Sequence, residues 1–414
     1  MTAGIILVLC LLVLLAYIFE LTSSKTKIPS VLLLLILGFI VRELCDFFGV
    51  NLGNLQNILP ILGTIGLILI VLEGSLELEL TKDKFPVIKK SVILGCIPLI
   101  AFALILAFIF NYISGIDFKT CLANAIPLAV ISSSVAIPSV RSFRRADREF
   151  VIYESSISDI IGVVLFNFIT MHESIGLFAF GSFLVQLIII IIISFIATGT
   201  LSFMLSRLEH HIKFVPIIFL VILIYEISKE FKLPSLVFIL VFGLFLNNLN
   251  EIRDIKWIKK LKPKVLRREV DKFREITIEA TFLVRALFFL LFGYLIQPKE
   301  VLNTDVLLYS VAITAGIYII RILALKLSRT KLVPLVFIAP RGLITILLFL
   351  AILPEARLPF INRSLIIQVI VLTSLIMMMG TISSKKDPKE KEEEKAKDNQ
   401  EGGENISWNT SLHD

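Results

Sequence analysis

The sequence predicts an all-α, polytopic membrane protein with about thirteen transmembrane helices. Hydrophobic residues make up 57% of its 414 residues and charged residues only 18%, against about 45–50% and about 25% in typical soluble proteins. The apolar residues form blocks of roughly 20 residues, the helix length that crosses a bilayer. Blocks such as 183–205 and 304–325 are apolar on every face. This pattern is typical of helices in lipid and differs from the alternating segments of barrel strands.

Short polar connections separate the apolar blocks along residues 1–382, the predicted membrane domain. Two longer segments are polar: residues 249–275 are strongly basic and predict a cytoplasmic loop with a surface helix. Residues 383–414 are charged, bury little and predict a disordered cytoplasmic tail. The blocks lie at about 3–22, 28–46, 58–76, 86–112, 119–140, 148–171, 175–206, 213–230, 232–248, 276–297, 304–326, 332–353 and 362–382.

Lysine and arginine predict the orientation of the chain in the membrane. They concentrate in the connections after odd-numbered blocks and are sparse after even-numbered ones. Since cytoplasmic loops carry the excess of basic residues, we expect the N-terminus outside and the C-terminus in the cytoplasm. We expect a multi-pass protein of the cell membrane, either an inner or a plasma membrane. The net charge of +7 is explained by topology, so no nucleic-acid partner is expected.

Two blocks carry helix-breaking residues at corresponding positions. Block 5 contains the serine run 132–134 between two prolines, and block 12 contains Pro-Arg-Gly at 340–342. Proline removes a helical hydrogen bond, and nearby hydroxyls can satisfy the freed backbone groups. The two blocks are both fifth in their half if residues 1–171 and 213–382 are repeats joined by a connector helix at 175–206. Matched broken helices of opposite topology indicate an inverted repeat with an ion site near the midplane.

Asp159 is the ionisable residue that most strongly suggests function, because it lies in the middle of an apolar block. Ser155 is one helical turn before it and shares its face, whereas Glu154 and Ser158 share another face. A carboxylate and a hydroxyl offer the hard oxygen ligands that suit a hard cation. A buried carboxylate can hold a proton or a cation, but not easily both, and this competition is the basis of antiport. The structural alternative is an aspartate neutralised by a buried arginine.

Three further ionisable residues stand out inside apolar blocks: Glu73, Arg285 and Arg341. Each costs about 2.5–3.5 kcal/mol on insertion scales, so each requires a partner or a function. Glu73 is deep in the third block, and Arg285 is expected to be a structural counter-ion. Glu77 and Glu79, at the inner end of the third block, are expected to face the inner surface. Glu79 is expected to contact solvent, whereas for Glu77 solvent contact and a functional role both stay open.

Three motifs resemble those of the sodium/proton exchanger superfamily, in its monovalent cation:proton antiporter-1 branch. Residues 154–159, Glu-Ser-Ser-Ile-Ser-Asp, resemble its Glu-Ser-x-x-Asn-Asp motif. Residues 72–76, Leu-Glu-Gly-Ser-Leu, resemble its Phe-Glu-Gly-Gly-Leu, and residues 340–343, Pro-Arg-Gly-Leu, resemble its Arg-Gly motif. The motifs occur in order on the expected helices, and the resemblance covers roughly residues 5–382.

The resemblance implies a homodimer with a mobile core domain that holds two crossed, partly unwound helices. It implies exchange of sodium, lithium or potassium for protons by an elevator-like movement, with a role in pH homeostasis. The single membrane carboxylate at the expected site favours one proton per cation, and hence electroneutral exchange. It also implies roles for individual residues: Asp159 binds the cation, Ser155 and Glu73 help to ligate it, Glu154 pairs with Arg341, and Arg285 is the basic residue of the tenth helix.

The sequence departs from the family pattern at two positions near Asp159. Ser158 replaces the usual Asn. Residues 134–136, Ser-Val-Ala, stand where the family has Thr-Asp-Pro on the fifth helix, so the second acid is missing. Ser158, Ser133 and Ser134 are then expected to offer hydroxyls that bind the cation at this site. The serine run is more similar to the second branch of the superfamily, which includes potassium-efflux systems.

Four functional alternatives follow from these observations. The first is a cation/proton antiporter, and the second is a potassium-efflux transporter or channel without a nucleotide-gating domain. A non-transporting sensor or scaffold is the third. The fourth, an intramembrane aspartyl protease, requires two facing aspartates, and Asp159 has no second aspartate deep in another apolar block. We therefore expect a transporter without enzymatic activity or a cofactor.

Overall fold

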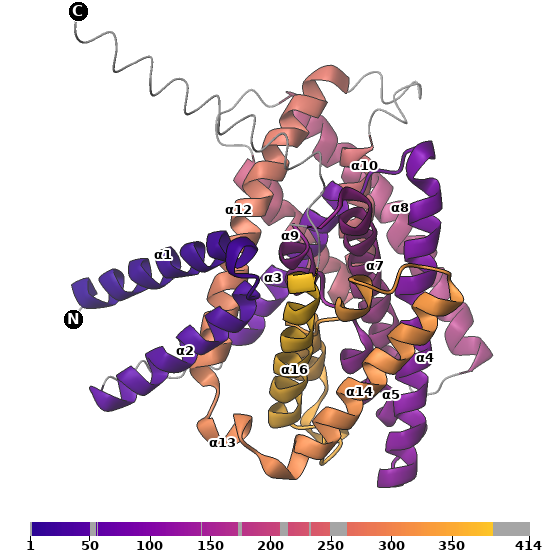
Figure 1. The fold of residues 1–414 in the computed structure, drawn as a ribbon. Helices are drawn as coiled ribbons and strands as arrows, with labels where there is room; N and C mark the ends of the chain where they lie inside the picture. The colour runs from indigo at the N-terminus through magenta and orange to yellow at the C-terminus, as the bar shows by residue number, and fades with distance from the viewer. Residues whose placement is uncertain are drawn as a thin grey trace, which may run out of the picture.

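The computed structural model describes residues 2–49, 55, 57–141, 143–172, 176–207, 214–231, 233–248 and 263–383. Within these residues every regular element is a helix (Figure 1), which confirms the predicted fold class. The predicted tail, apart from its first residue, and residues 249–262 of the predicted loop lie outside the described part of the chain.

Each of the thirteen predicted blocks contains helix in the described residues, and eight segments are long and apolar enough to cross a membrane. The main helices are α1 (Thr2–Thr26), α2 (Ser30–Phe47), α3 (Ile58–Glu77), α4 (Phe85–Ser114), α5 (Phe118–Ala129), α6 (Ser133–Ser139), α7 (Arg145–Met171), α8 (Leu177–Arg207), α9 (Phe214–Glu230), α10 (Leu236–Asn247), α12 (Pro263–Leu295), α13 (Pro298–Val301), α14 (Thr304–Leu327), α15 (Leu343–Ala351) and α16 (Arg363–Ser383).

Helix α12 begins well before the predicted start of its block at residue 276. Its first turns carry Leu266, Val270 and Phe273, all of which are buried. These side chains are three or four residues apart and therefore lie on one helical face. Because that face packs against the protein, the second half of the expected loop continues the spanning helix.

The helices pack as two groups. The first group is α1, α2, α3, α8, α9, α10 and α12, and the second is α4 to α7 with α14 to α16. Figure 1 shows α2 and α12 on one side of the molecule and α4, α5 and α14 on the other. Helix α3 contacts α6, α7 and α15, and α1 contacts α6, so both helices line the boundary between the groups.

Two interrupted helices meet in the second group. Helix α5 ends at Ala129 and α6 starts at Ser133, while an extended segment at 338–342 precedes α15. The backbone N–H of Ser132 donates to the carbonyl of Pro340 at 3.0 Å. A Cβ at Gly342 would lie 2.5 Å from Val135 Cγ2 and 2.9 Å from Ser132 Oγ. The absence of a side chain at Gly342 therefore permits the crossing. The repeat boundaries and the connector role of α8 stay predictions.

Glycines also set the closest approach in the first group. A Cβ at Gly38 of α2 would overlap the carbonyl oxygen of Leu290 on α12 and lie 2.8 Å from Tyr294 N. Small residues that let helix backbones approach are a common source of packing energy in membranes, where no hydrophobic force drives helices together.

We expect Gly38→Ala to destabilise the protein by about 1–3 kcal/mol, because the added methyl group must separate two backbones. The measurement is unfolding in detergent micelles. Gly181→Ala is the matched control, since a Cβ at Gly181 meets nothing within 4 Å. Equal stability of the two variants would contradict the close α2–α12 contact.

Candidate functional site

Asp159 lies in the middle of α7 and is only 2% exposed. Ser133, the first residue of α6, donates to Asp159 Oδ2 through its backbone N–H at 3.1 Å and also through its hydroxyl. The other carboxylate oxygen, Oδ1, is buried and has no hydrogen-bond partner. Among the described residues no ion pair involves Asp159. The arrangement therefore differs from an aspartate neutralised by an arginine.

The other predicted hydroxyls have separate contacts around Asp159. Ser155 is fully buried and its hydroxyl donates to the Val151 carbonyl at 2.7 Å. Ser158 accepts a hydrogen bond at 3.0 Å from the backbone N–H of Ile131, in the gap between α5 and α6. Ser134 Oγ lies 2.9 Å from Ser132 Oγ. Ser158 thus satisfies a backbone group that the helix break leaves open.

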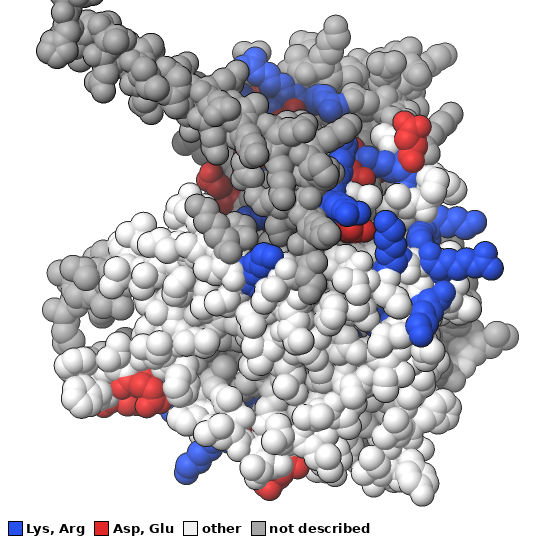
Figure 2. Space-filling view, in the orientation of Figure 1, with Lys and Arg blue, Asp and Glu red and all other residues white. Residues whose placement is uncertain are grey.

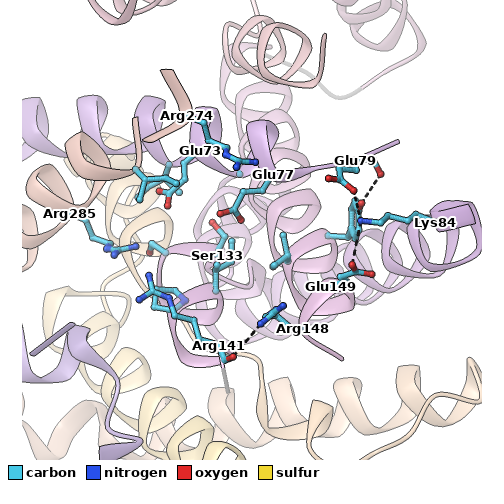
Figure 3. Close-up of a pocket in the computed structure, with 18 residues that line it drawn as sticks. Glu73, Glu77, Glu79, Lys84, Ser133, Arg141, Arg148, Glu149, Arg274 and Arg285 are labelled. Carbon is cyan, nitrogen blue, oxygen red and sulfur yellow. Dashed lines mark hydrogen bonds and ion pairs between the residues drawn. The ribbon is translucent and has the colours of Figure 1, made fainter. Parts of the chain in front are cut away.

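A cavity of about 400 Å³ extends to the start of α6 (Figure 3); we call it the vestibule. Ser133 and Ser134 line its wall, whereas Asp159 lies behind them. Among the described residues, five basic side chains and four glutamates line the vestibule. They are Lys84, Arg141, Arg148, Arg274, Arg285, Glu73, Glu77, Glu79 and Glu149.

The structure brings Glu73 to the vestibule, together with Arg285 and Ser133. Glu77 lines the same cavity, and Figure 3 shows it between Arg274 and Ser133. Both glutamates are only partly exposed. Glu77 therefore lies among the charged residues of the vestibule.

A cluster around Lys84 closes one side of the vestibule where α3 leads to α4. Lys84 Nζ is 2.6 Å from Glu79 Oε2 and 3.4 Å from Glu149 Oε1, and the Tyr153 hydroxyl donates to the Glu79 carbonyl at 2.7 Å. The hydrogen bond from Lys84 holds the pKa of the Glu79 carboxyl below its ordinary value. Glu79 therefore stays ionised at the edge of the cavity.

The predicted pair of Glu154 with Arg341 is wrong. The Arg341 guanidinium instead donates to carbonyls at the end of α5, from Nε to Leu128 at 2.6 Å and from Nη2 to Ala129 at 3.2 Å. A helix end leaves its last carbonyls unpaired and carries partial negative charge. Arg341 lies on the extended segment beside this helix end. Its guanidinium donates hydrogen bonds to the unpaired carbonyls, and its positive charge compensates the partial negative charge.

Glu154 pairs with Arg321 of α14. The contact is bidentate, at 2.8 and 2.9 Å, and the two side chains are 1% and 5% exposed. Arg321 also donates to the Leu335 carbonyl at 2.8 Å. The signal that could have identified Arg321 is the one that identified Arg285, a basic residue inside an apolar block.

Arg285 pairs with an acid that the sequence analysis did not consider, Glu20 of α1. Arg285 Nη2 is 3.3 Å from Glu20 Oε1, Arg141 Nη2 is 3.2 Å from the same oxygen, and the Ser30 hydroxyl donates to Oε2 at 2.8 Å. Glu20 lies near the end of the first apolar block, and an acid inside an apolar block is a signal that could have identified it.

The described residues contain no cluster of three His, Cys, Asp or Glu side chains that could hold a metal. The oxygen-rich surroundings of Asp159 could hold a hard monovalent cation through a carboxylate and hydroxyls. The same carboxylate could alternatively take a proton.

A family model described as "Sodium/hydrogen exchanger, transmembrane" matches residues 10–384. Two solved structures of the sodium proton antiporter MjNhaP1 from Methanocaldococcus jannaschii are similar to this chain. The structure at pH 8 has a TM-score of 0.60 and 20% identity, covering 91% of this chain and 95% of that chain. A 3D EM map has a TM-score of 0.64 and 20% identity, covering 92% and 95%. No curated protein matches the chain.

We expect Glu154→Gln to lower the free energy of unfolding by about 3–5 kcal/mol, because Arg321 would be left buried without a counter-charge. Unfolding in detergent micelles measures the loss. Glu226→Gln, which removes an exposed pair with Lys229, is the control and should cost less than about 1 kcal/mol.

The double variant Glu154→Gln/Arg321→Met should recover much of the lost stability, since no uncompensated charge remains. A double variant as unstable as Glu154→Gln would contradict the pairing.

Proposed function

The chain belongs to the sodium/hydrogen exchanger family of transmembrane proteins, and from this premise we propose that it is a secondary antiporter that exchanges sodium, lithium or potassium for protons at Asp159. The observation that carries the proposal is the buried Oδ1 of Asp159, which has no hydrogen-bond partner. A buried unsatisfied polar atom costs about 1–3 kcal/mol and more when charged. A cation or a proton can supply the missing partner.

Competition for one carboxylate explains the exchange. The ionised form of Asp159 attracts a cation, and the protonated form has no charge to offer. Ser133 donates two hydrogen bonds to Oδ2, so Oδ1 is the oxygen that changes partner. Among the described residues no second acid contacts Asp159, which supports one proton exchanged per monovalent cation.

We assign supporting roles to the surrounding oxygens. The Ser155 hydroxyl donates its hydrogen bond to the Val151 carbonyl, so the lone pairs of its oxygen can ligate the cation beside Asp159. Ser133 and Ser134 lie between the vestibule and Asp159 and are assigned to the entry path. Ser158 stabilises the break between α5 and α6 by accepting the hydrogen bond from Ile131. Glu73 attracts the cation within the vestibule.

The charge distribution supports an inward-facing vestibule. Figure 2 shows Lys and Arg gathered toward the upper part of the molecule and sparse in the lower part. The vestibule is lined by Lys84, Arg141 and Arg148, which follow odd-numbered blocks. By the positive-inside rule this side is cytoplasmic, with the N-terminus outside in a cell membrane.

The two helix groups support an elevator-like movement. Asp159, Ser133 and the crossed breaks all belong to the second group, while Glu73 belongs to α3 of the first. Movement of the second group against the first would carry Asp159 to the other side. We assign dimerisation to the first group, as the family resemblance implies, and cation-dependent control of cellular pH as the role.

The second candidate is a potassium-efflux transporter or channel, which is favoured by the serine run 132–134 in place of an acid. The vestibule ends at Ser133 and Ser134, with Asp159 behind them. A carboxylate enclosed in this way suits alternating access better than continuous conduction.

We expect Asp159→Asn to reduce exchange with sodium, lithium and potassium to the level of empty vesicles, because the amide carries no charge for either ion. The measurement is a pH-sensitive dye in vesicles that contain the purified protein. Asp46→Asn, which alters an exposed carboxylate paired with Arg42, is the control and should keep wild-type exchange. Cation flux without proton movement would favour the channel, and no flux with any of the three cations would contradict both candidates.

We expect the exchange rate to be independent of membrane voltage, because one positive charge moves in each direction. The exchange rate is measured in vesicles whose membrane voltage is set by a potassium gradient and valinomycin, with sodium or lithium as the transported cation. A current that follows the cation gradient would contradict electroneutral exchange.

A further inference from the structure

Glu20 on α1 joins three separate elements near the vestibule. The side chain is largely buried. It accepts hydrogen bonds from Ser30 on α2 and Arg285 on α12, and it forms an ion pair with Arg141 after α6. Arg141 belongs to the second helix group, whereas the other partners belong to the first. Glu20 therefore lies at the boundary between the two groups.

The two arginines depend on Glu20 to different extents. The Arg285 side chain is 8% exposed and the Arg141 side chain is 54% exposed. A buried guanidinium requires a counter-charge, whereas an exposed one is compensated largely by water. The main electrostatic task of Glu20 is thus to hold and neutralise Arg285.

Arg285 also lines the vestibule, in the same wall as Glu73 (Figure 3). Arg285 pairs with Glu20, and no ion pair joins it to Glu73. If the long Arg285 side chain were released from Glu20, Glu73 would be an acid in the same cavity with which it could pair. Pairing with Glu73 would remove the negative charge that faces an entering cation.

We infer that Glu20 is a positioning residue for cation transport: it holds Arg285 away from Glu73 and so keeps the Glu73 carboxylate available to the cation in the vestibule. The inference rests on the proposed exchange function. Glu20 does not line the vestibule, and its effect on the cation is therefore transmitted through Arg285.

The test compares full-length wild-type protein with Glu20→Gln, Arg285→Gln and the double variant in sodium-loaded or lithium-loaded vesicles. We expect Glu20→Gln to raise the KM for the cation about fivefold, with a much smaller change in the maximal rate. The KM of the double variant should equal that of Arg285→Gln, since Glu20 has no guanidinium left to hold. A merely structural role would change the amount of active protein and leave KM unaltered.

Glu226→Gln on α9, which removes an exposed pair with Lys229, is the matched control and should keep the wild-type KM. If Glu20→Gln does not reach the membrane, the KM of the double variant is compared with the KM of Arg285→Gln. The double variant leaves no buried guanidinium without a partner, so it is expected to fold.

An unchanged KM in Glu20→Gln overturns the inference, as does a KM in the double variant clearly above that of Arg285→Gln. Both results leave the proposed function intact. Absence of exchange in the wild-type protein overturns the proposed function, and this inference with it.

Discussion

The contact between Arg341 and the end of α5 is the interaction on which the rest of the site depends. Helix α5 stops at Ala129 inside the protein, so its last carbonyls cannot be satisfied by water. The Arg341 guanidinium bonds two of them, and Ser132 bonds Pro340 across the crossing. These bonds fix the position of α6, whose first residue, Ser133, holds Asp159. The position of the proposed ion site is therefore a consequence of how two broken helices satisfy each other's backbones.

The buried acids divide according to their partners. Glu154 forms a bidentate pair with Arg321, and Glu20 contacts both Arg285 and Arg141, so the negative charge of each acid is compensated and each has a structural task. Asp159 is equally buried but receives only hydrogen bonds from Ser133, and one of its oxygens has no partner. Because an unpaired buried charge is costly, such a carboxylate gains most from a proton or a cation. The distribution of arginines thus separates the proposed transport residue from the structural ones.

The vestibule combines many charges of both signs near a proposed path for cations. Lys84 is held by Glu79 and Glu149, and Arg285 and Arg141 by Glu20. Basic residues engaged in this way repel a cation less than free ones would, because each positive charge has a nearby counter-charge. Basic residues can therefore line the vestibule without closing the proposed path to a cation. The glutamates that do this come from both helix groups, which links the state of the vestibule to the relative position of the groups.

The sequence by itself determined the all-helical membrane fold, the positions of the spanning blocks, the two broken helices and the prominence of Asp159. These features depend on block length, on proline and on residues one turn apart, all of which are local. Only the tertiary structure decided which arginine pairs with which acid: Glu154 takes Arg321 in place of the predicted Arg341, and Glu20 emerges as the partner of Arg285. Such partners are far apart in the chain and are chosen by depth in the membrane and by the unpaired carbonyls nearby, which no local pattern records.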